Sequence, residues 1–410
     1  MQNTFKKILT IILIIILIIA FSSSYNYSNI DNLAFVVALG IDVSDTKNIK
    51  VTFQFVKPPS TSEGSNQESK IFEDSVDCDS IINGINIMNS YIARKLDLSH
   101  CRVIIFSEEV AKNGISDYVY SLMNDVQVRP RSNIIVSKCS ASYYIENSVP
   151  SLETSITKYY DIFHNSGKYT GYINTATIGD FFNALSCNNC EPYAILGGVS
   201  SGKGTSDTLT STDSNVKANS SPISGSRSTE NIGTAVFKEG QLVGELTGVE
   251  TMCLNLLKGN LNSFVLSIPE PTNSNNENSS DKKIDLLIMP KSKKKINAQI
   301  INGSPYIKID IELSAKIYSL SKNSNYEDTT VLSSISNSCN KYLESLISDY
   351  LYKTSKEFKS DINGFGRYLL SNFTTNKEFN DFGWLNNYIN TTFDVNVDTN
   401  VDSGFLLKKT

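Results

Sequence analysis

The longest apolar run of the chain lies close to its first residue. Residues 8–21 contain one threonine and no charge, and Lys6 and Lys7 come directly before them. Two cations followed by an apolar run are typical of an export signal or an amino-terminal membrane anchor. As a helix the run would be about 21 Å long, against roughly 30 Å for a hydrocarbon core, so its length leaves both interpretations open. We expect residues 1–24 to form this segment and the rest to lie outside the cytoplasm.

The next part of the chain alternates strand patterns with helix patterns. Residues 33–42 are almost continuously apolar, as in a fully buried strand, and residues 49–56 alternate, so the two predict a hairpin. A helical face follows, and a second one begins after Ser107, whose hydroxyl can cap it. The first face consists of Ile81, Ile85, Met88, Ile92 and Leu96, and short buried strands are expected at residues 103–106 and 133–137. This order predicts a mixed α/β domain over residues 25–197.

The composition changes after this first domain. Residues 198–230 are rich in Ser, Thr, Asn and Gly with few large apolar side chains, so we expect a low-complexity linker there. Short strand patterns resume in residues 231–280, around a tight turn predicted at Glu239 and Gly240. We expect a small middle domain in this segment.

The last third, residues 281–410, predicts a further α/β domain. Asn302 and Gly303 separate two alternating runs, which is a strong hairpin signal. A long helical face follows over residues 332–350, and residues 393–401 alternate as a final strand. The expected fold class is α+β: an exported ectodomain of about three mixed α/β domains with antiparallel and mixed sheets, behind an amino-terminal membrane segment.

The composition as a whole argues against several classes of function. The net charge is -5 and the isoelectric point is about 5.3, so no basic surface for nucleic acid is expected. Two histidines, His100 and His164, are too few for most histidine-based zinc sites or acid–base machinery. The seven cysteines are spread too widely for a disulfide scaffold, and we expect most to be buried and reduced. We expect no cofactor and no metal.

Two short motifs invite a functional interpretation. Residues 197–204 nearly match a phosphate-binding loop, but Gly204 stands where the loop needs a hydroxyl for magnesium, so plain linker is favoured. Cys187 and Cys190 have the spacing of a redox pair, but the predicted helix precedes them instead of following them. A local disulfide or two unlinked thiols is expected.

Neighbouring carboxylates could be taken for a glycosidase pair. Asp77 with Asp79, and Glu108 with Glu109, are each better explained by the preference of helix amino termini for negative charge. No nucleophile, base and oxyanion site come together in the sequence, so we expect no enzyme.

Several segments occur in an order and at a spacing that point to a known family. They are residues 32–42, 96–100, 105–111, 128–131, 234–237, 242–246 and 361–366, together with Trp384. With them the chain resembles, over nearly its whole length after Asn29, the C-subunit family of spore germinant receptors (the Ger(x)C family).

The resemblance implies a membrane-anchored protein of three mixed α/β domains on the outer face of the spore inner membrane. It implies two integral-membrane partner subunits, of A and B type, with which nutrients trigger germination, and the family is not known for catalysis. Members usually carry a cysteine after the apolar run that takes a lipid. Here Ser22, Ser23 and Ser24 stand at that place, and the first cysteine is Cys78. We therefore expect no lipid attachment and an uncleaved segment that tethers the ectodomain directly.

Five polar residues near the family-like motifs are candidates for partner contact or for a family signature: Arg94, His100, Glu108, Arg129 and Arg131. The alternative is that they fix the local fold through hydrogen bonds. An alternative function is that of an exported substrate-binding protein for a small nutrient, which predicts a deep pocket between two lobes. A third, an exported hydrolase, lacks a catalytic constellation.

Overall fold

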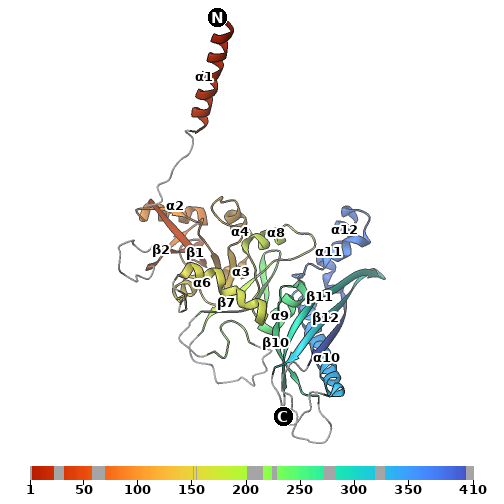
Figure 1. Cartoon of the computed structure of the whole chain (residues 1–410). Coiled ribbons are helices and arrows are strands. Elements are labelled where there is room, and N and C mark those ends of the chain that lie inside the picture. Colours follow the sequence, from red (N-terminus) through yellow and green to blue (C-terminus); the bar gives the residue numbers. More distant parts are fainter. Residues whose placement is uncertain are drawn as a thin grey trace, which may run out of the picture.

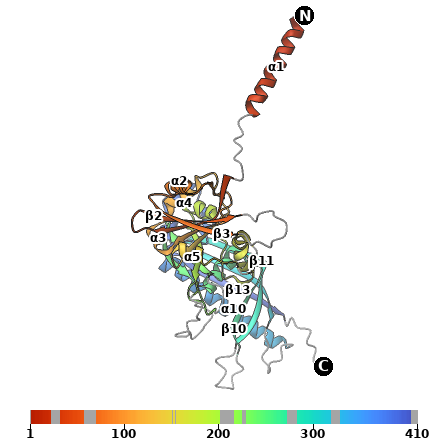
Figure 2. The same ribbon diagram turned by 90° about the vertical axis from the view of Figure 1, so that its left-hand side faces the viewer.

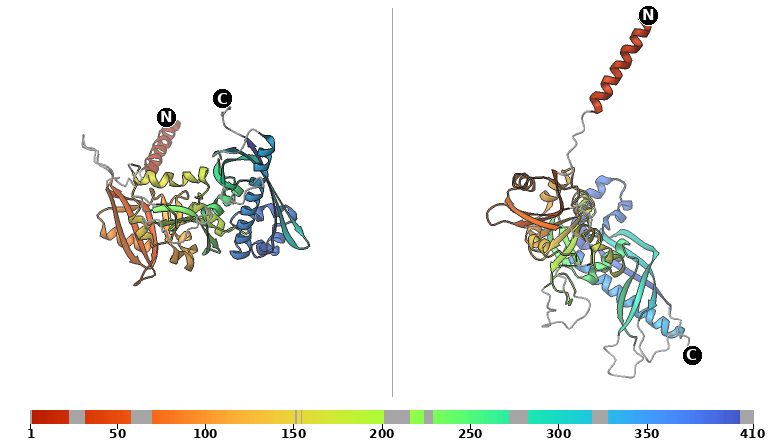
Figure 3. Two further views of the ribbon diagram at one scale, coloured as in Figure 1. Left: turned by 90° about the horizontal axis from the view of Figure 1, so that it is seen from below. Right: turned by 60° about the vertical axis from the view of Figure 1, so that its left-hand side comes forward.

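The computed structural model describes residues 2–22, 32–57, 70–150, 152–153, 155–200, 216–223, 229–271, 283–318 and 328–402. Its body contains two β-sheets with helices packed against them (Figure 1). Seen from below, the two sheets and their helices lie side by side (Figure 3). Each sheet has its own buried apolar core. The expected α+β class, with antiparallel and mixed sheets, is confirmed.

Helix α1 (Gln2–Ser22) stands apart from this body (Figures 1 and 2). Its apolar side chains from Phe5 to Ile16, where described, are exposed. Among the described helices, none combines the length and the apolar character needed to cross a bilayer.

The first sheet contains nine strands among the described residues, in the order β3-β2-β1-β5-β6-β7-β8-β9, with β4 beside β1. Its centre, β1-β5-β6-β7, is parallel, and antiparallel strands flank it on both sides. The strands are β1 (Leu33–Val43), β2 (Ile49–Lys57), β3 (Lys70–Cys78), β4 (Lys95–Asp97), β5 (Val103–Ser107), β6 (Asn133–Ser137), β7 (Tyr193–Val199), β8 (Thr229–Lys238) and β9 (Gln241–Leu246).

Helices cover both faces of this sheet. Val51 of β2 lies against Gly84 of α2, whereas the Gln54 amide donates to the Ile145 carbonyl of α5. Residues three apart on a strand point to opposite faces, so α2 and α5 lie on opposite sides. The helices of this unit are α2 (Ile81–Tyr91), α3 (Glu108–Asn113), α4 (Ser116–Met123), α5 (Ala141–Glu146), α6 (Ile156–Ile162), η2 (Phe163–Ser166), α7 (Gly167–Thr170) and α8 (Ile178–Leu185).

The second sheet has the order β10-β11-β12-β13, with β13 parallel to β12 and the other pairs antiparallel. Helix α10 (Thr329–Tyr352) packs on β13 and buries the predicted apolar face. The strands are β10 (Phe264–Pro269), β11 (Lys283–Ile301), β12 (Ser304–Ile317) and β13 (Thr392–Asp402), and the other helices are α9 (Gly248–Lys258), η4 (Lys353–Glu357), α11 (Gly366–Leu369), η5 (Leu370–Asn372), α12 (Asn376–Phe382), α13 (Trp384–Asn387) and η6 (Tyr388–Asn390).

The local predictions from turn and cap residues are confirmed. β8 and β9 join at Glu239 and Gly240, whose φ angles are 51° and 80°, and β11 and β12 join through Asn302 and Gly303 at 51° and 80°. Positive φ at both central residues is the signature of the two-residue hairpin turn. The Ser107 hydroxyl caps α3 by accepting from the Val110 N–H.

Two stretches differ from the expectation. The helix predicted to run through Leu96 ends at Tyr91, because the Asn89 side chain accepts from the Leu96 N–H and residues 95–97 add to the sheet beside β1. Residues 231–280, expected as a small middle domain, contribute β8 and β9 to the first sheet and α9 and β10 to the second core.

The predicted linker lies partly outside the described residues, which omit 201–215 and 224–228. Of the rest, Ala218 is buried and its N–H donates to the Ile232 carbonyl of β8. This part of the segment therefore packs on the first sheet.

Candidate functional site

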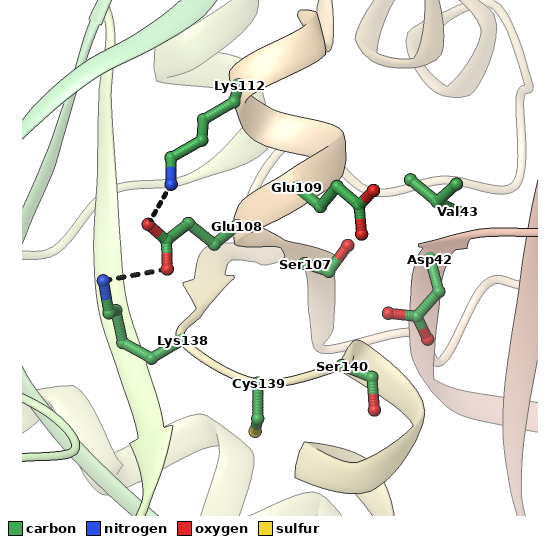
Figure 4. A pocket seen from close by; sticks show the side chains of 9 residues that line it. All are labelled: Asp42, Val43, Ser107, Glu108, Glu109, Lys112, Lys138, Cys139 and Ser140. Atoms are coloured by element: carbon green, nitrogen blue, oxygen red, sulfur yellow. Dashed lines mark ion pairs between the residues drawn. The ribbon is translucent and has the colours of Figure 1, made fainter.

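The carboxyl ends of β1, β5 and β6 meet at one edge of the first sheet, because these strands are parallel. A cavity of about 370 Å³ opens there (Figure 4). Open α/β sheets commonly bind ligands in a crevice at this edge. The cavity is lined by Asp42, Val43, Ser107, Glu108, Glu109, Lys112, Lys138, Cys139 and Ser140.

A chain of ion pairs crosses this edge. The Lys138 ammonium lies 2.8 Å from Glu108 and 2.5 Å from Glu245, while Lys112 contacts Glu108 at 2.6 Å and Lys217 contacts Glu245 at 2.8 Å. Figure 4 shows Lys112 and Lys138 reaching Glu108 from two sides. Burial alone would raise the pKa of Glu108, but hydrogen bonds from the two lysines hold it below its ordinary value. The charges of the cavity are thus largely committed to one another.

The hydroxyls and the thiol of the cavity serve the fold. Ser107 and Ser140 accept hydrogen bonds from the N–H groups of Val110 and Tyr143, as helix caps. Burial raises the pKa of the Cys139 thiol, which keeps it in the weakly nucleophilic form. Across the part of the chain that the structure describes, no group of three or more His, Cys, Asp or Glu is placed to hold a metal ion.

The five candidate residues are divided between two edges. Glu108 follows β5 at the carboxyl edge, whereas His100 precedes β5, and Arg129 and Arg131 precede β6, at the amino edge. The five residues of β5 separate the two positions by roughly 16 Å. Arg94 also lies at the amino edge, where its guanidinium donates to the Leu33 carbonyl at 3.5 Å. The structure therefore brings four of them to one edge and leaves Glu108 at the other.

His100 packs locally. Its ring meets Phe35 edge-on at 4.5 Å between centroids, and its Nδ1 lies 3.0 Å from the Ser99 hydroxyl. By contrast, Arg129 and Arg131 are exposed.

The contacts of Asp361 join the two units. Buried Asp361 accepts hydrogen bonds from the Trp384 indole N–H at 2.8 Å and from the Gly366 N–H at 3.0 Å. The Asp361 carbonyl accepts from the N–H of Glu191, which precedes β7 in the first unit. Gly366 leaves no room for a side chain, because a Cβ there would lie 2.5 Å from the Trp384 ring.

The cysteine pair lies at this junction as well. Cys187 and Cys190 form a disulfide, which settles the two alternatives left by the sequence. The other cysteines are unlinked, and Cys78, Cys101, Cys253 and Cys339 are buried as expected.

Comparison with known protein families decides the affiliation. Residues 26–196 match the model of the Spore germination protein N-terminal domain, and residues 232–404 match that of Spore germination B3/GerAC like, C-terminal. The chain belongs to this family of spore germination proteins. The resemblance read from the sequence is thereby confirmed.

Two known proteins are similar to this chain over most of its length. Spore germination protein KC of Bacillus subtilis (strain 168) is 22% identical over 373 residues, which cover 88% of this chain and 86% of that protein. The crystal structure of the GerBC protein aligns over 88% of this chain and 96% of its own, with 16% identity and a TM-score of 0.49.

The Asp361 junction lies between the two family-matched segments. Glu191 belongs to the first segment, and Asp361 and Trp384 belong to the second. Sequence reasoning did not choose these residues as candidates, although residues 361–366 and Trp384 carried part of the family resemblance. The cavity residues Asp42 and Lys138 were also missed. Their signal is their place at the carboxyl end of a buried parallel strand, where functional groups of α/β sheets gather: Asp42 is the penultimate residue of β1, and Lys138 directly follows β6.

Asp42 is expected to stabilise the carboxyl edge. It is 5% exposed, and its carboxylate accepts from the Ala141 and Ser142 N–H groups at 2.6 and 2.9 Å. Asp42→Ala should lower the free energy of unfolding by about 1–3 kcal/mol, because both amides of α5 lose their acceptor. Urea denaturation should show a smaller loss for Asp42→Asn, which keeps one acceptor, and almost none for the exposed Asp45→Ala. Equal losses in all three variants would contradict this role.

Proposed function

We propose that the protein is a non-catalytic, membrane-anchored subunit of a spore germinant receptor. It would act with two integral-membrane subunits, of A and B type, on the extracytoplasmic face of the spore inner membrane, where nutrients trigger germination. The match of both halves of the chain, in order, to models of spore germination proteins carries the proposal.

The carboxyl-edge cavity supports a role without catalysis. Lys138 is held by two carboxylates, Ser107 and Ser140 cap helices, and the Cys139 thiol is kept protonated. A nucleophile needs an adjacent base or a lowered pKa, and the pKa of the Cys139 thiol is raised instead. The ion pairs of Lys138, which directly follows β6, instead link α3 with β9, which suits a rigid body that works by contact with partners.

Helix α1 supports anchoring at a membrane. Phe5 is 71% exposed, Leu13 is 62% exposed and Ile16 is 59% exposed. Each square ångström of apolar surface left in water forgoes roughly 25 cal/mol, so this row of side chains is stabilised by an apolar surrounding such as a bilayer. Lys6 and Lys7 precede the apolar run that begins at Ile8, on the side expected to stay cytoplasmic.

Deletion of the gene should abolish germination in response to particular nutrients and leave spore formation intact. The reason is that a receptor subunit is needed for signal detection and not for assembly of the spore. Single nutrients and their mixtures, scored by loss of optical density, would identify the response, and reintroduction of the gene is the control. In the wild type, the protein should co-purify from membranes with the two other subunits.

Normal germination of the deletion strain with every nutrient would contradict the receptor role. An exported substrate-binding protein makes a different prediction: the purified full chain in detergent should bind a small nutrient saturably, without any other subunit.

A further inference from the structure

The amino edge of the first sheet exposes apolar side chains as well as cations. Val126, in the turn after α4, is 100% exposed, and Tyr91, the last residue of α2, is 74% exposed. Arg94 and Lys95 follow Tyr91, and Arg129 and Arg131 follow Val126, and all four cations are exposed. We call these six residues the amino-edge surface. Helices α2 and α4 lie on the side of the body nearest α1 (Figures 1 and 2).

The chain leaves α1 and enters the body at this surface. Leu33, the first residue of β1, pairs with Lys95 of β4 and accepts the Arg94 hydrogen bond. Ten residues, 23–32, separate α1 from β1 and can span at most about 36 Å. An apolar phase that holds α1 is therefore within reach of the amino-edge surface.

The exposure of Val126 is fixed by its neighbours. The Asp125 side chain accepts from the Gln127 N–H at 2.9 Å, and the Asp125 carbonyl accepts from the Val128 N–H at 3.1 Å. The Gln127 side chain in turn accepts from the Leu98 N–H at 2.9 Å, which ties this turn to the segment after β4. A bonded turn thus holds an aliphatic side chain fully in solvent at the same edge of the sheet as Tyr91 and the arginines.

The charge of the surface suits an anionic partner. Within the described residues, no ion pair links Arg94, Lys95, Arg129 or Arg131 to a carboxylate. The acids of the same loops, Asp97 and Asp125, accept hydrogen bonds from N–H groups of their own loops. Four cations against two acids give a net charge of +2 here, on a chain whose net charge is -5.

We propose that the amino-edge surface rests on the anionic lipid headgroups of the membrane that holds α1. Val126 enters the boundary between headgroups and acyl chains, Tyr91 lies at headgroup level, as tyrosines do at membrane interfaces, and the cations contact lipid phosphates. The body is thereby oriented, with the carboxyl-edge cavity facing away from the bilayer. This inference rests on the proposed membrane anchoring and adds to it a defined contact face.

A tryptophan placed in the surface tests the contact. The full chain carrying Val126→Trp is reconstituted in vesicles of phosphatidylglycerol and brominated phosphatidylcholine, where bromine quenches tryptophans that reach the acyl chains. Residue 126 should be quenched, whereas the buried native Trp384 provides a constant background. The matched control is Tyr143→Trp on α5 at the carboxyl edge, half exposed in the native chain, which should not be quenched.

Charge variants test the lipid specificity. In the Val126→Trp chain, Arg94, Arg129 and Arg131 are all replaced by Gln. This triple replacement should lower the ratio of docked to undocked protein by on the order of 100-fold, since each cation near an anionic surface contributes roughly fivefold. Quenching should also fall when phosphatidylglycerol is left out. The control variant removes the same charge from the second unit by replacing the exposed Lys308, Lys316 and Lys341 with Gln. It should retain quenching.

Flotation of the vesicles separates the two proposals. A chain that does not float with the vesicles overturns the anchoring. A chain that floats while residue 126 stays unquenched overturns the lipid contact and leaves the anchoring intact. Quenching that requires the receptor's membrane subunits would assign the surface to a protein partner and likewise overturn the lipid contact.

Discussion

Replacing Trp384 with phenylalanine is expected to lower the free energy of unfolding by about 2–4 kcal/mol. Trp384 is 1% exposed, and its indole N–H donates one of the two hydrogen bonds that the Oδ2 atom of Asp361 accepts. Phenylalanine is smaller and has no donor, so the variant leaves a cavity and a poorly satisfied carboxylate. Asp361 has little reserve, because its Oδ1 atom already has no hydrogen-bond partner.

A double-mutant cycle isolates the contribution of this hydrogen bond. Trp384→Phe, Asp361→Asn and the combination should be compared by urea denaturation followed by far-UV circular dichroism, because Trp384 is the only tryptophan. The double variant should lose less than the sum of the single losses, by about 0.5–3 kcal/mol. Tyr352→Phe, at an exposed aromatic residue, is the control and should change stability by less than about 0.5 kcal/mol. Strictly additive losses would show that Trp384 acts by packing alone.

The consequence of Trp384→Phe should extend to the junction of the two units. Asp361 binds Trp384 through its side chain and Glu191 through its carbonyl, and the neighbouring Ser360 hydroxyl donates to the Phe237 carbonyl of β8. A displaced Asp361 therefore loosens contacts of both units.

Local chemistry made part of the fold predictable. The turn at Glu239 and Gly240, the turn at Asn302 and Gly303, and the cap at Ser107 each depend on a few adjacent residues, and each is found. The pairing of strands distant in sequence could not be read in this way. β8 joins β7 across the low-complexity segment, and β13 runs parallel to β12 after a long helical excursion. Periodicity shows that a strand has a buried face but does not name its neighbour.

The candidate residues show the same limit. His100 and Glu108 were grouped because both lie near the family-like motifs, yet β5 carries the chain from one edge of the sheet to the other between them. The opposite error concerns Glu245, which is more than a hundred residues from Lys138 but contacts it at 2.5 Å. The residues that meet at one edge of a parallel sheet are those at the ends of adjacent strands. They can be predicted only when the strand order is known.

The stability of the protein is expected to depend on the protonation of Glu191. Glu191 is 5% exposed, and burial, the largest influence, raises the pKa of its carboxyl group to about 7. Its Oε2 atom accepts from the Glu239 N–H in the β8–β9 turn, whereas its Oε1 atom has no partner. The negative charge of nearby Asp361 raises the pKa further.

The direction of the pH dependence follows from these pKa values. The folded pKa of about 7 lies above the ordinary value of 4.5, so the folded protein binds more protons between the two. The contribution of the Glu191 carboxyl group to the free energy of unfolding should therefore be greatest below about pH 4.5. It should fall as the pH rises to about 7. The difference between the two pKa values corresponds to up to about 3 kcal/mol.

Glu191→Gln should abolish this part of the pH dependence and make the protein more stable than the wild type near pH 8. The amide keeps an acceptor for the Glu239 N–H and carries no charge into the buried junction. Urea denaturation at a series of pH values measures the effect, and Glu312→Gln, the same substitution at an exposed position of β12, should reproduce the wild-type profile. A Glu191→Gln protein that is less stable than the wild type at pH 8 would mean that the ionised carboxylate holds the junction together, since the charge would then contribute more through its hydrogen bond than it loses by burial.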